Sequence, residues 1–132
     1  MISWAGLLVI KDRKVLMTKE KDKDFFMLPG GRIESEESHL QTILREIEEE
    51  LGKHIKVKDI QYYNSYILPG KAENSNMEFH VYSGKISGKF ILQNEIKEIR
   101  WINSIDVKNG EKIGNITSLK LFPELLEKGL ID

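Results

Sequence analysis

The chain of 132 residues contains no cysteine. A disulfide framework, a thiol nucleophile and a zinc site built from cysteine ligands are therefore excluded. Histidine is scarce as well, since only His39, His54 and His80 are present. None of them is spaced from another as zinc ligands usually are, which argues against a histidine-rich metal site.

Long apolar runs are also missing. No segment approaches the roughly 20 apolar residues of a membrane-spanning helix. The first residues, Met1 to Trp4, are not a basic stretch followed by an apolar run, so no signal peptide is indicated. We therefore expect a soluble, cytoplasmic protein that has no membrane partner.

Neither sign of charge prevails, because 20 basic and 21 acidic residues leave a net charge of −1. A broad basic surface is not expected, which argues against a nucleic-acid polymer as partner. The distribution is uneven, since residues 31–52 hold seven acidic and two basic side chains. A cation bound together with an anionic substrate would reconcile this acidic segment with the mildly basic remainder.

Length and composition fit a single domain spanning residues 1–132. Apolar runs bounded by turn-forming residues predict strands at 4–10, 15–17, 55–57, 60–68, 77–83, 85–92 and 96–102. Helical patterns predict helices at 36–51 and 117–128 and a single turn at 104–107, and Pro123 either restarts or kinks the last helix. This order predicts an α/β (α+β) fold in which a mixed β-sheet is packed between helices.

The segment 36–51 has the strongest helical pattern. Ser35 is expected to cap its start, with Glu36 and Glu37 in the first turn, and Gly52 to end it. Its apolar side chains form one stripe about 100° wide, which we expect to be buried. The stripe consists of Leu40, Ile43, Leu44, Ile47 and Leu51.

Three glutamates of this helix share one flank. At about 100° per residue, Glu46, Glu49 and Glu50 lie together, whereas Glu48 points elsewhere. Carboxylates at these spacings repel one another, but they suit a hard cation such as Mg²⁺, and Arg45 is placed to brace them by charge-assisted hydrogen bonds. The alternative is a solvated acidic face without a site, which is the commoner meaning of such a run taken alone.

The context of the glutamates carries a family resemblance. The spacing Gly31-x5-Glu37-x7-Arg45-Glu46-Ile47-x-Glu49-Glu50-x-Gly52 resembles the signature of the Nudix hydrolase family. The lead-in Leu28-Pro29-Gly30-Gly31 and the segment from Glu95 to Trp101 also resemble family features. One position departs, because Lys53 stands where the family has an aliphatic residue. The resemblance extends over nearly the whole chain and implies an αβα sandwich.

The resemblance further implies a hydrolase that uses Mg²⁺ or Mn²⁺ to cleave a nucleoside diphosphate linked to another moiety. Glu49 and Glu50 would be metal ligands, and Glu46 would be a further ligand or the base that prepares the attacking water. Glu37 would help to position the metal site, and Arg45 would orient the glutamates.

Other residues are weaker predictions. Glu95 or Glu98 would supply another ligand or the general base, while Gly30, Gly31, Arg32 and Lys19 would contact the substrate phosphates. His80 is expected to be a structural or surface histidine and not a catalyst. Aromatic side chains could stack on a base, although core packing is favoured for them: Trp4, Phe26, Tyr62, Tyr66 and Phe79.

The favoured substrate is a nucleoside triphosphate, canonical or oxidised, as in the MutT-like branch, which would give a monophosphate and pyrophosphate. ADP-ribose and dinucleoside polyphosphates are alternatives within the same chemistry. A non-catalytic nucleotide-sensing module and a plain structural domain are alternatives of other classes, whereas the related isoprenoid diphosphate isomerase needs a cysteine that is missing here. Monomer and homodimer both stay open.

Overall fold

The computed structural model describes residues 2–70, 75–93 and 95–132. The strands are β1 (Ile2–Leu8), β2 (Ile10–Lys11), β3 (Lys14–Glu20), β4 (Gly30–Arg32), β5 (Lys56–Leu68), β6 (Met77–Ser87) and β7 (Ile96–Ile102). The helices are α1 (His39–Leu51), α2 (Ser104–Lys108), the wide helical turn η1 (Thr117–Leu121) and α3 (Phe122–Glu127). None of these helices is long and apolar enough to cross a membrane.

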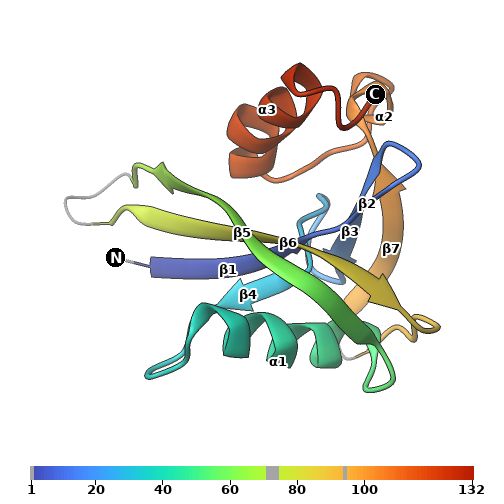
Figure 1. Cartoon of the computed structure of the whole chain (residues 1–132). Coiled ribbons are helices and arrows are strands. Elements are labelled where there is room, and N and C mark those ends of the chain that lie inside the picture. The colour runs from blue at the N-terminus through green and yellow to red at the C-terminus, as the bar shows by residue number, and fades with distance from the viewer. Residues whose placement is uncertain (1, 71–74, 94) are drawn as a thin grey trace.

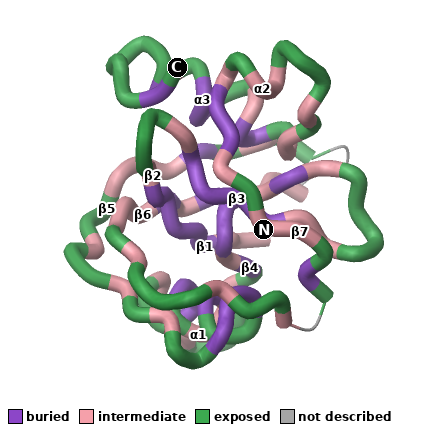
Figure 2. Tube along the Cα trace, turned by 90° about the vertical axis from the view of Figure 1, so that its right-hand side faces the viewer, coloured by how far each residue is buried: buried purple, intermediate pink, exposed green. Residues whose placement is uncertain are grey.

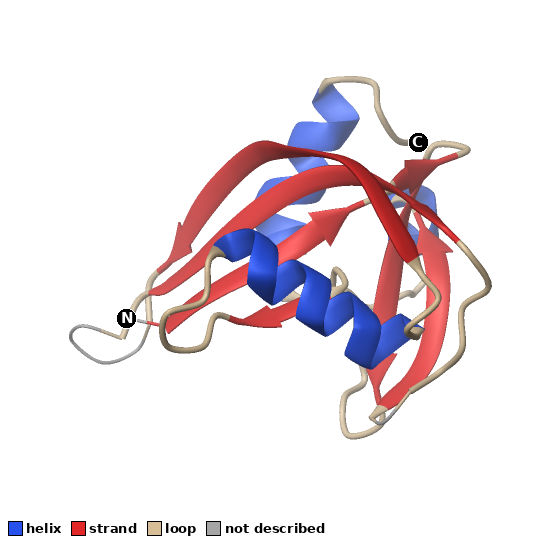
Figure 3. Ribbon diagram, turned by 60° about the horizontal axis from the view of Figure 1, so that its bottom comes forward, coloured by secondary structure: helices blue, strands red, loops and turns tan. Residues whose placement is uncertain are grey.

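The strands form two sheets. One has the order β4-β1-β6-β5, with β1 parallel to β6 and the other pairs antiparallel, and the second has the order β2-β3-β7. The chain leaves the first sheet after Leu8 and enters the second at Ile10, so a single residue links the two. Figures 1 and 3 show α1 on one side of the strands and α3 on the other. The predicted αβα sandwich with a mixed sheet is thus confirmed.

The strands have a hydrophobic core on each side, one toward α1 and one toward α3, because successive side chains of a strand point to opposite faces. Ala5 and Leu7 of β1 pack with Ile43 and Ile47 of α1, whereas Leu8 belongs to the core beneath α3. Buried segments accordingly run through the middle of the molecule, and exposed ones follow its rim (Figure 2). The position of α1 is therefore fixed by the alternation in β1.

The start of α1 differs from the prediction. The N-cap is Ser38, not Ser35, and its hydroxyl accepts a hydrogen bond from the Gln41 amide while the Gln41 side chain bonds back to Ser38. Glu36 has a φ of 68°, outside the helical region, so Glu36 and Glu37 precede the helix instead of filling its first turn. This reciprocal capping box satisfies two free backbone amides, which explains why the helix begins here.

The buried stripe of α1 is also narrower than predicted. Leu40 and Leu44 are 43% and 45% exposed, whereas Ile43, Ile47 and Leu51 are at most 2% exposed. The helix lies on β1 and β4 with only one edge, so the outer half of the predicted apolar stripe has no layer to cover it.

This difference predicts a contrast in stability. Replacing Ile47 by alanine should lower the free energy of unfolding by about 3 kcal/mol, because it leaves a cavity in a closed core. Replacing Leu44 by alanine should cost less than about 0.5 kcal/mol, because its side chain already contacts solvent. Urea unfolding of both variants checks this, and equal losses would contradict the packing of α1.

Strand boundaries show three further differences. The predicted strands 55–57 and 60–68 are one strand, β5, in which bulges follow Lys58 and Tyr62. The predicted break at 83–84 is absent, since β6 continues through Gly84 to Ser87, and no strand forms at 88–92. A side chain at Gly84 would approach Leu7 to 3.0 Å, so this glycine serves close packing instead of a turn.

In the C-terminal segment Pro123 stands in the first turn of α3, where its missing amide costs little.

Candidate active site

Glu50 is the most deeply buried carboxylate of the predicted set. It is 8% exposed, and its two oxygens accept hydrogen bonds from different elements. The Thr18 hydroxyl of β3 donates to Oε1 at 3.2 Å, and the Gly30 amide of β4 donates to Oε2 at 3.1 Å. The sequence places Glu50 on the flank of a helix, but one strand from each of the two sheets determines its orientation.

Burial raises the pKa of Glu50 and of the neighbouring Glu46. Removal from water raises the pKa of Glu50 well above its usual value, and the nearby Glu46 carboxylate raises it further. Burial is likewise the main cause that raises the pKa of Glu46, opposed by its hydrogen bond with Arg45. Buried carboxylates this close together are stable as anions only beside positive charge.

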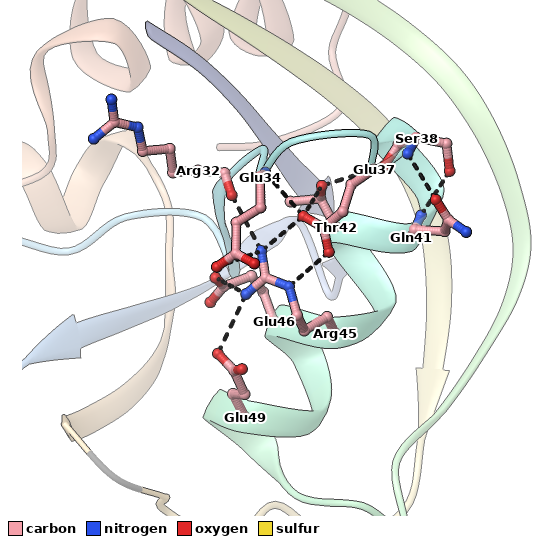
Figure 4. A network of polar contacts seen from close by, with 9 residues as sticks. All are labelled: Arg32, Glu34, Glu37, Ser38, Gln41, Thr42, Arg45, Glu46 and Glu49. Atoms are coloured by element: carbon pink, nitrogen blue, oxygen red, sulfur yellow. Dashed lines mark hydrogen bonds and ion pairs between the residues drawn. The ribbon is translucent and has the colours of Figure 1, made fainter.

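Arg45 joins the glutamates into one network (Figure 4). Its Nε donates to Glu37 Oε2 at 2.8 Å, and its Nη1 donates to Glu46 Oε1 at 2.8 Å. Nη1 also lies 3.5 Å from a Glu49 oxygen, and Nη2 donates to the Arg32 carbonyl. The pKa of Glu37 is lowered to about 2, and the hydrogen bonds with Arg45 are the largest cause.

Two consecutive glycines make room for this arrangement. A Cβ on Gly31 would lie 2.3 Å from the Glu46 carboxylate, and a Cβ on Gly30 would lie 2.3 Å from the Ala5 carbonyl. Gly30 also has a φ of 153°, which side chains rarely adopt. The space at both positions is thus filled by the protein itself, and contact of these glycines with a substrate stays a prediction.

Three carboxylates of α1 line one cleft of about 480 Å³. Two other hollows of the surface are larger, so charge and not size distinguishes this one. Seven residues line it, five of them acidic: Glu20, Glu46, Glu49, Glu50, Gln93, Glu95 and Ile96. The structure therefore brings Glu95 to the three glutamates of α1, as the sequence predicted only by family resemblance.

Glu20 is the lining residue that sequence reasoning missed. It ends β3, two positions after Thr18, so both side chains point to the face that carries Glu50. Burial raises the pKa of Glu20, and the neighbouring Asp22 and Glu95 add to the effect. The strand period from Thr18 could have indicated Glu20, but only if the position of β3 beside α1 had been known.

Besides Arg45, Glu37 and the two glycines, three further predicted residues lie outside the lining of the cleft. Glu98 on β7 contacts Lys19 at 3.7 Å and Arg100 at 2.6 Å. The Lys19 ammonium stands over the Phe26 ring, on the strand face opposite Thr18. The Arg32 side chain extends away from Arg45 (Figure 4). Their roles toward phosphate or catalysis stay predictions, and of the two candidate bases the cleft favours Glu95 over Glu98.

Most aromatic candidates are core residues, as expected. Phe26, Tyr66 and Phe79 are buried, and Tyr62 is exposed. Trp4 is partly buried and stacks on Phe79 with ring centroids 6.5 Å apart. These two rings line a mostly apolar cavity of about 200 Å³ together with Met27, Asn115 and others.

Two histidines that are distant in sequence meet in the structure. The rings of His39 and His80 stack with centroids 4.1 Å apart. His80 also bonds to Ser65 and lies 2.6 Å from a Glu78 oxygen, which fits the structural role predicted for it. Neither histidine lines the acidic cleft.

The donor set of the cleft fits Mg²⁺ or Mn²⁺. Its groups are hard carboxylate oxygens, and Glu50 is a buried carboxylate whose charge needs compensation. Within residues 2–70, 75–93 and 95–132, no three acidic or histidine side chains already converge as metal ligands do. Metal ligation by Glu46, Glu49 and Glu50 therefore stays a prediction that requires these side chains to move closer together.

The chain is similar in sequence to known proteins. The sequence profile of the NUDIX domain matches residues 3–124. An ADP-ribose pyrophosphatase of Methanocaldococcus jannaschii is 41% identical over 56 residues, which are 40% of this chain and 33% of that protein. The Nudix hydrolase YvcI of Bacillus subtilis, which is uncharacterized, is 25% identical over 100 residues, 74% of this chain and 63% of that protein. The chain thus spans one third of the first relative and about three fifths of the second.

A solved structure agrees with the fold. The MutT Nudix hydrolase from Burkholderia pseudomallei superposes with a TM-score of 0.70 at 21% identity, over 96% of this chain and 95% of that one. The NUDIX profile covers nearly the whole chain, including α1 and the glycines before it. The chain therefore belongs to the Nudix hydrolase family, with a MutT-like fold.

Proposed function

We propose that the chain is a pyrophosphohydrolase that cleaves the diphosphate linkage of a nucleoside diphosphate derivative with the help of Mg²⁺ or Mn²⁺. The observation that carries this proposal is the acidic cleft, in which α1, the end of β3 and the turn before β7 bring five glutamates together. Arg45 and the Gly30 amide bond to the glutamates of α1, and Gly31 leaves room for Glu46. Arg45 and Gly31 belong to the family signature, and Gly30 directly precedes it.

The residues of the chain have distinct parts in this proposal. Glu46, Glu49 and Glu50 would hold the metal, which supplies charge neutralisation at the diphosphate and acidifies water. Glu46 or Glu95 would take the proton from the attacking water, since both line the cleft. Arg45 and Glu37 would act indirectly, because their hydrogen bonds fix the position of Glu46.

We infer a nucleoside triphosphate, canonical or oxidised, as the substrate class. The apolar cavity beside Trp4 and Phe79 suits a planar base, and the Asn115 amide on its wall offers both a donor and an acceptor. The MutT-like fold agrees with this choice. ADP-ribose is the second candidate, favoured by the 41% identity over 56 residues with an ADP-ribose pyrophosphatase.

A matched pair of helix variants tests the proposed activity. Glu49→Gln should lower the Mg²⁺-dependent rate about 100-fold or more, because it removes a charged ligand from the cleft. Glu48→Gln should leave the rate within about twofold, because Glu48 is exposed and does not line the cleft. Released phosphate and pyrophosphate are counted with a panel of canonical and oxidised nucleoside triphosphates, ADP-ribose, nucleotide sugars and dinucleoside polyphosphates.

The panel also separates the alternatives. Binding of nucleotides without turnover of any of them would favour the sensing module. Wild-type activity of the Glu49→Gln variant would show that the assigned ligands are wrong, and an equal loss in the Glu48→Gln variant would show that general helix charge, not the cleft, matters.

A further inference from the structure

Thr18 is a polar residue where the strand pattern favours an apolar one. Leu16, two positions earlier, points to the core beneath α1, and the strand period places Thr18 on the same face. Thr18 is 4% exposed. A buried hydroxyl is costly unless it is hydrogen-bonded, and the hydroxyl of Thr18 donates to Glu50 Oε1 at 3.2 Å.

The backbone of Thr18 is held rigidly on both sides. It pairs with Ile99 of β7 on one side. On the other side it exchanges two hydrogen bonds of 2.8 Å with Met27. The hydroxyl is therefore delivered to Glu50 from a fixed point of the sheet and not from a mobile loop.

The second support of Glu50 comes from a different direction. Gly30 donates its amide to the other carboxylate oxygen at 3.1 Å, so two donors define the plane of the carboxylate. Gly30 belongs to the lead-in of the family signature, whereas Thr18 lies well before it. Each carboxylate oxygen can accept more than one hydrogen bond or metal contact, so both retain capacity toward the cleft.

We propose that Thr18 is a positioning residue that holds the Glu50 carboxylate in the orientation required for cation binding. This inference rests on the proposed function. Outer hydrogen bonds to a metal-binding side chain commonly change metal affinity 10- to 100-fold when they are lost. The Thr18 hydroxyl, and not its methyl group, performs this role.

Mn²⁺ binding to the intact chain tests the inference without an activity assay. Free Mn²⁺ is measured by electron paramagnetic resonance in titrations of the wild type and of Thr18→Val, which keeps the shape but loses the hydroxyl. We expect the valine variant to bind Mn²⁺ about 10- to 100-fold more weakly. Thr18→Ser, which restores the hydroxyl without the methyl group, should return the affinity to within about threefold of the wild type.

A matched control separates this role from general packing. Thr117→Val makes the same change at another buried threonine, which lies on η1 away from the acidic cleft, and should leave Mn²⁺ affinity unchanged. Thermal unfolding without metal verifies that each variant is folded. If Thr18→Val does not fold and Thr18→Ser does, a wild-type Mn²⁺ affinity of the serine variant still supports the role of the hydroxyl.

Two results would overturn the inference in different ways. Equal Mn²⁺ affinity of the wild type and Thr18→Val, or equal weakening in the valine and serine variants, would refute the positioning role and leave the proposed function intact. Absence of Mn²⁺ binding by the wild type would refute the proposed function itself and the inference with it.

Discussion

Replacing Glu50 by glutamine should abolish activity and yet stabilise the metal-free protein. Activity should fall at least about 100-fold, because a carboxylate that we propose as a metal ligand is lost. Glutamine has nearly the same shape, and its amide can still pair with the Gly30 amide and the Thr18 hydroxyl. The stability gain follows because the buried negative charge is removed.

The gain should depend on pH with a definite sign. Because the pKa of Glu50 is raised in the folded state, its contribution to stability is fully present below about pH 4.3, the ordinary pKa of a glutamate. That contribution is lost as the pH rises through the folded-state pKa, since the unfolded chain then releases the proton more readily. Glu50→Gln has no such loss, so its advantage over the wild type should grow from pH 4.5 to pH 7.5.

Urea unfolding in the presence of a chelator measures this difference at the two pH values. Each unit by which the pKa is raised is worth about 1.4 kcal/mol at neutral pH. Glu48→Gln is the control, because it makes the same chemical change at an exposed residue of the same helix that does not line the cleft. A Glu50→Gln variant that is less stable than the wild type at both pH values would contradict the burial of an uncompensated carboxyl group.

Alanine should mainly affect stability at Gly30 and mainly affect activity at Gly31. Gly30→Ala should lower the free energy of unfolding by about 3 kcal/mol or more. Its Cβ would meet the Ala5 carbonyl at 2.3 Å and the Gly6 Cα at 2.6 Å, and backbone atoms of β1 cannot move aside without breaking the pairing with β4.

Gly31→Ala should fold but lose activity. Its Cβ would collide with the Glu46 carboxylate, which lies at the end of a flexible side chain and can swing away. We expect a loss of about 1 kcal/mol in stability. A displaced catalytic group can lower the rate about 100-fold.

Denaturant unfolding combined with an assay on the best substrate of the panel distinguishes the two variants. The expected pattern is a destabilised Gly30→Ala and a stable, inactive Gly31→Ala. A fully active Gly31→Ala would mean that the position of Glu46 seen here is not the one that catalysis needs.

The strand and helix order could be predicted from sequence because it depends on local patterns. The turn between β2 and β3 is an example, since Asp12 and Arg13 both have positive φ values and lie in the polar interruption between the strands predicted at 4–10 and 15–17. The exact start of α1 was missed because Ser35 and Ser38 are both suitable caps. Only the side chain of Gln41 favours Ser38, through the capping box.

The burial of α1 was not predictable from its own sequence. Leu40 and Ile43 belong to the same apolar stripe, yet only Ile43 is covered. Hydrophobic patterning says which face of a helix turns inward, but not how much of that face the neighbouring layer covers. That width depends on where β1 and β4 lie relative to the helix axis.

The sequence by itself determined the chemistry of the candidate site, because carboxylates at fixed spacing on one helix, preceded by paired glycines, restrict the choice of cation and family. Only the tertiary structure decided which side chains join them. Glu20 at the end of β3 and Glu95 in the turn before β7 are distant from α1 in sequence, and Thr18 orients Glu50 across the gap between sheet and helix. Spacing along one element is a local property, whereas the meeting of three elements depends on how the layers pack.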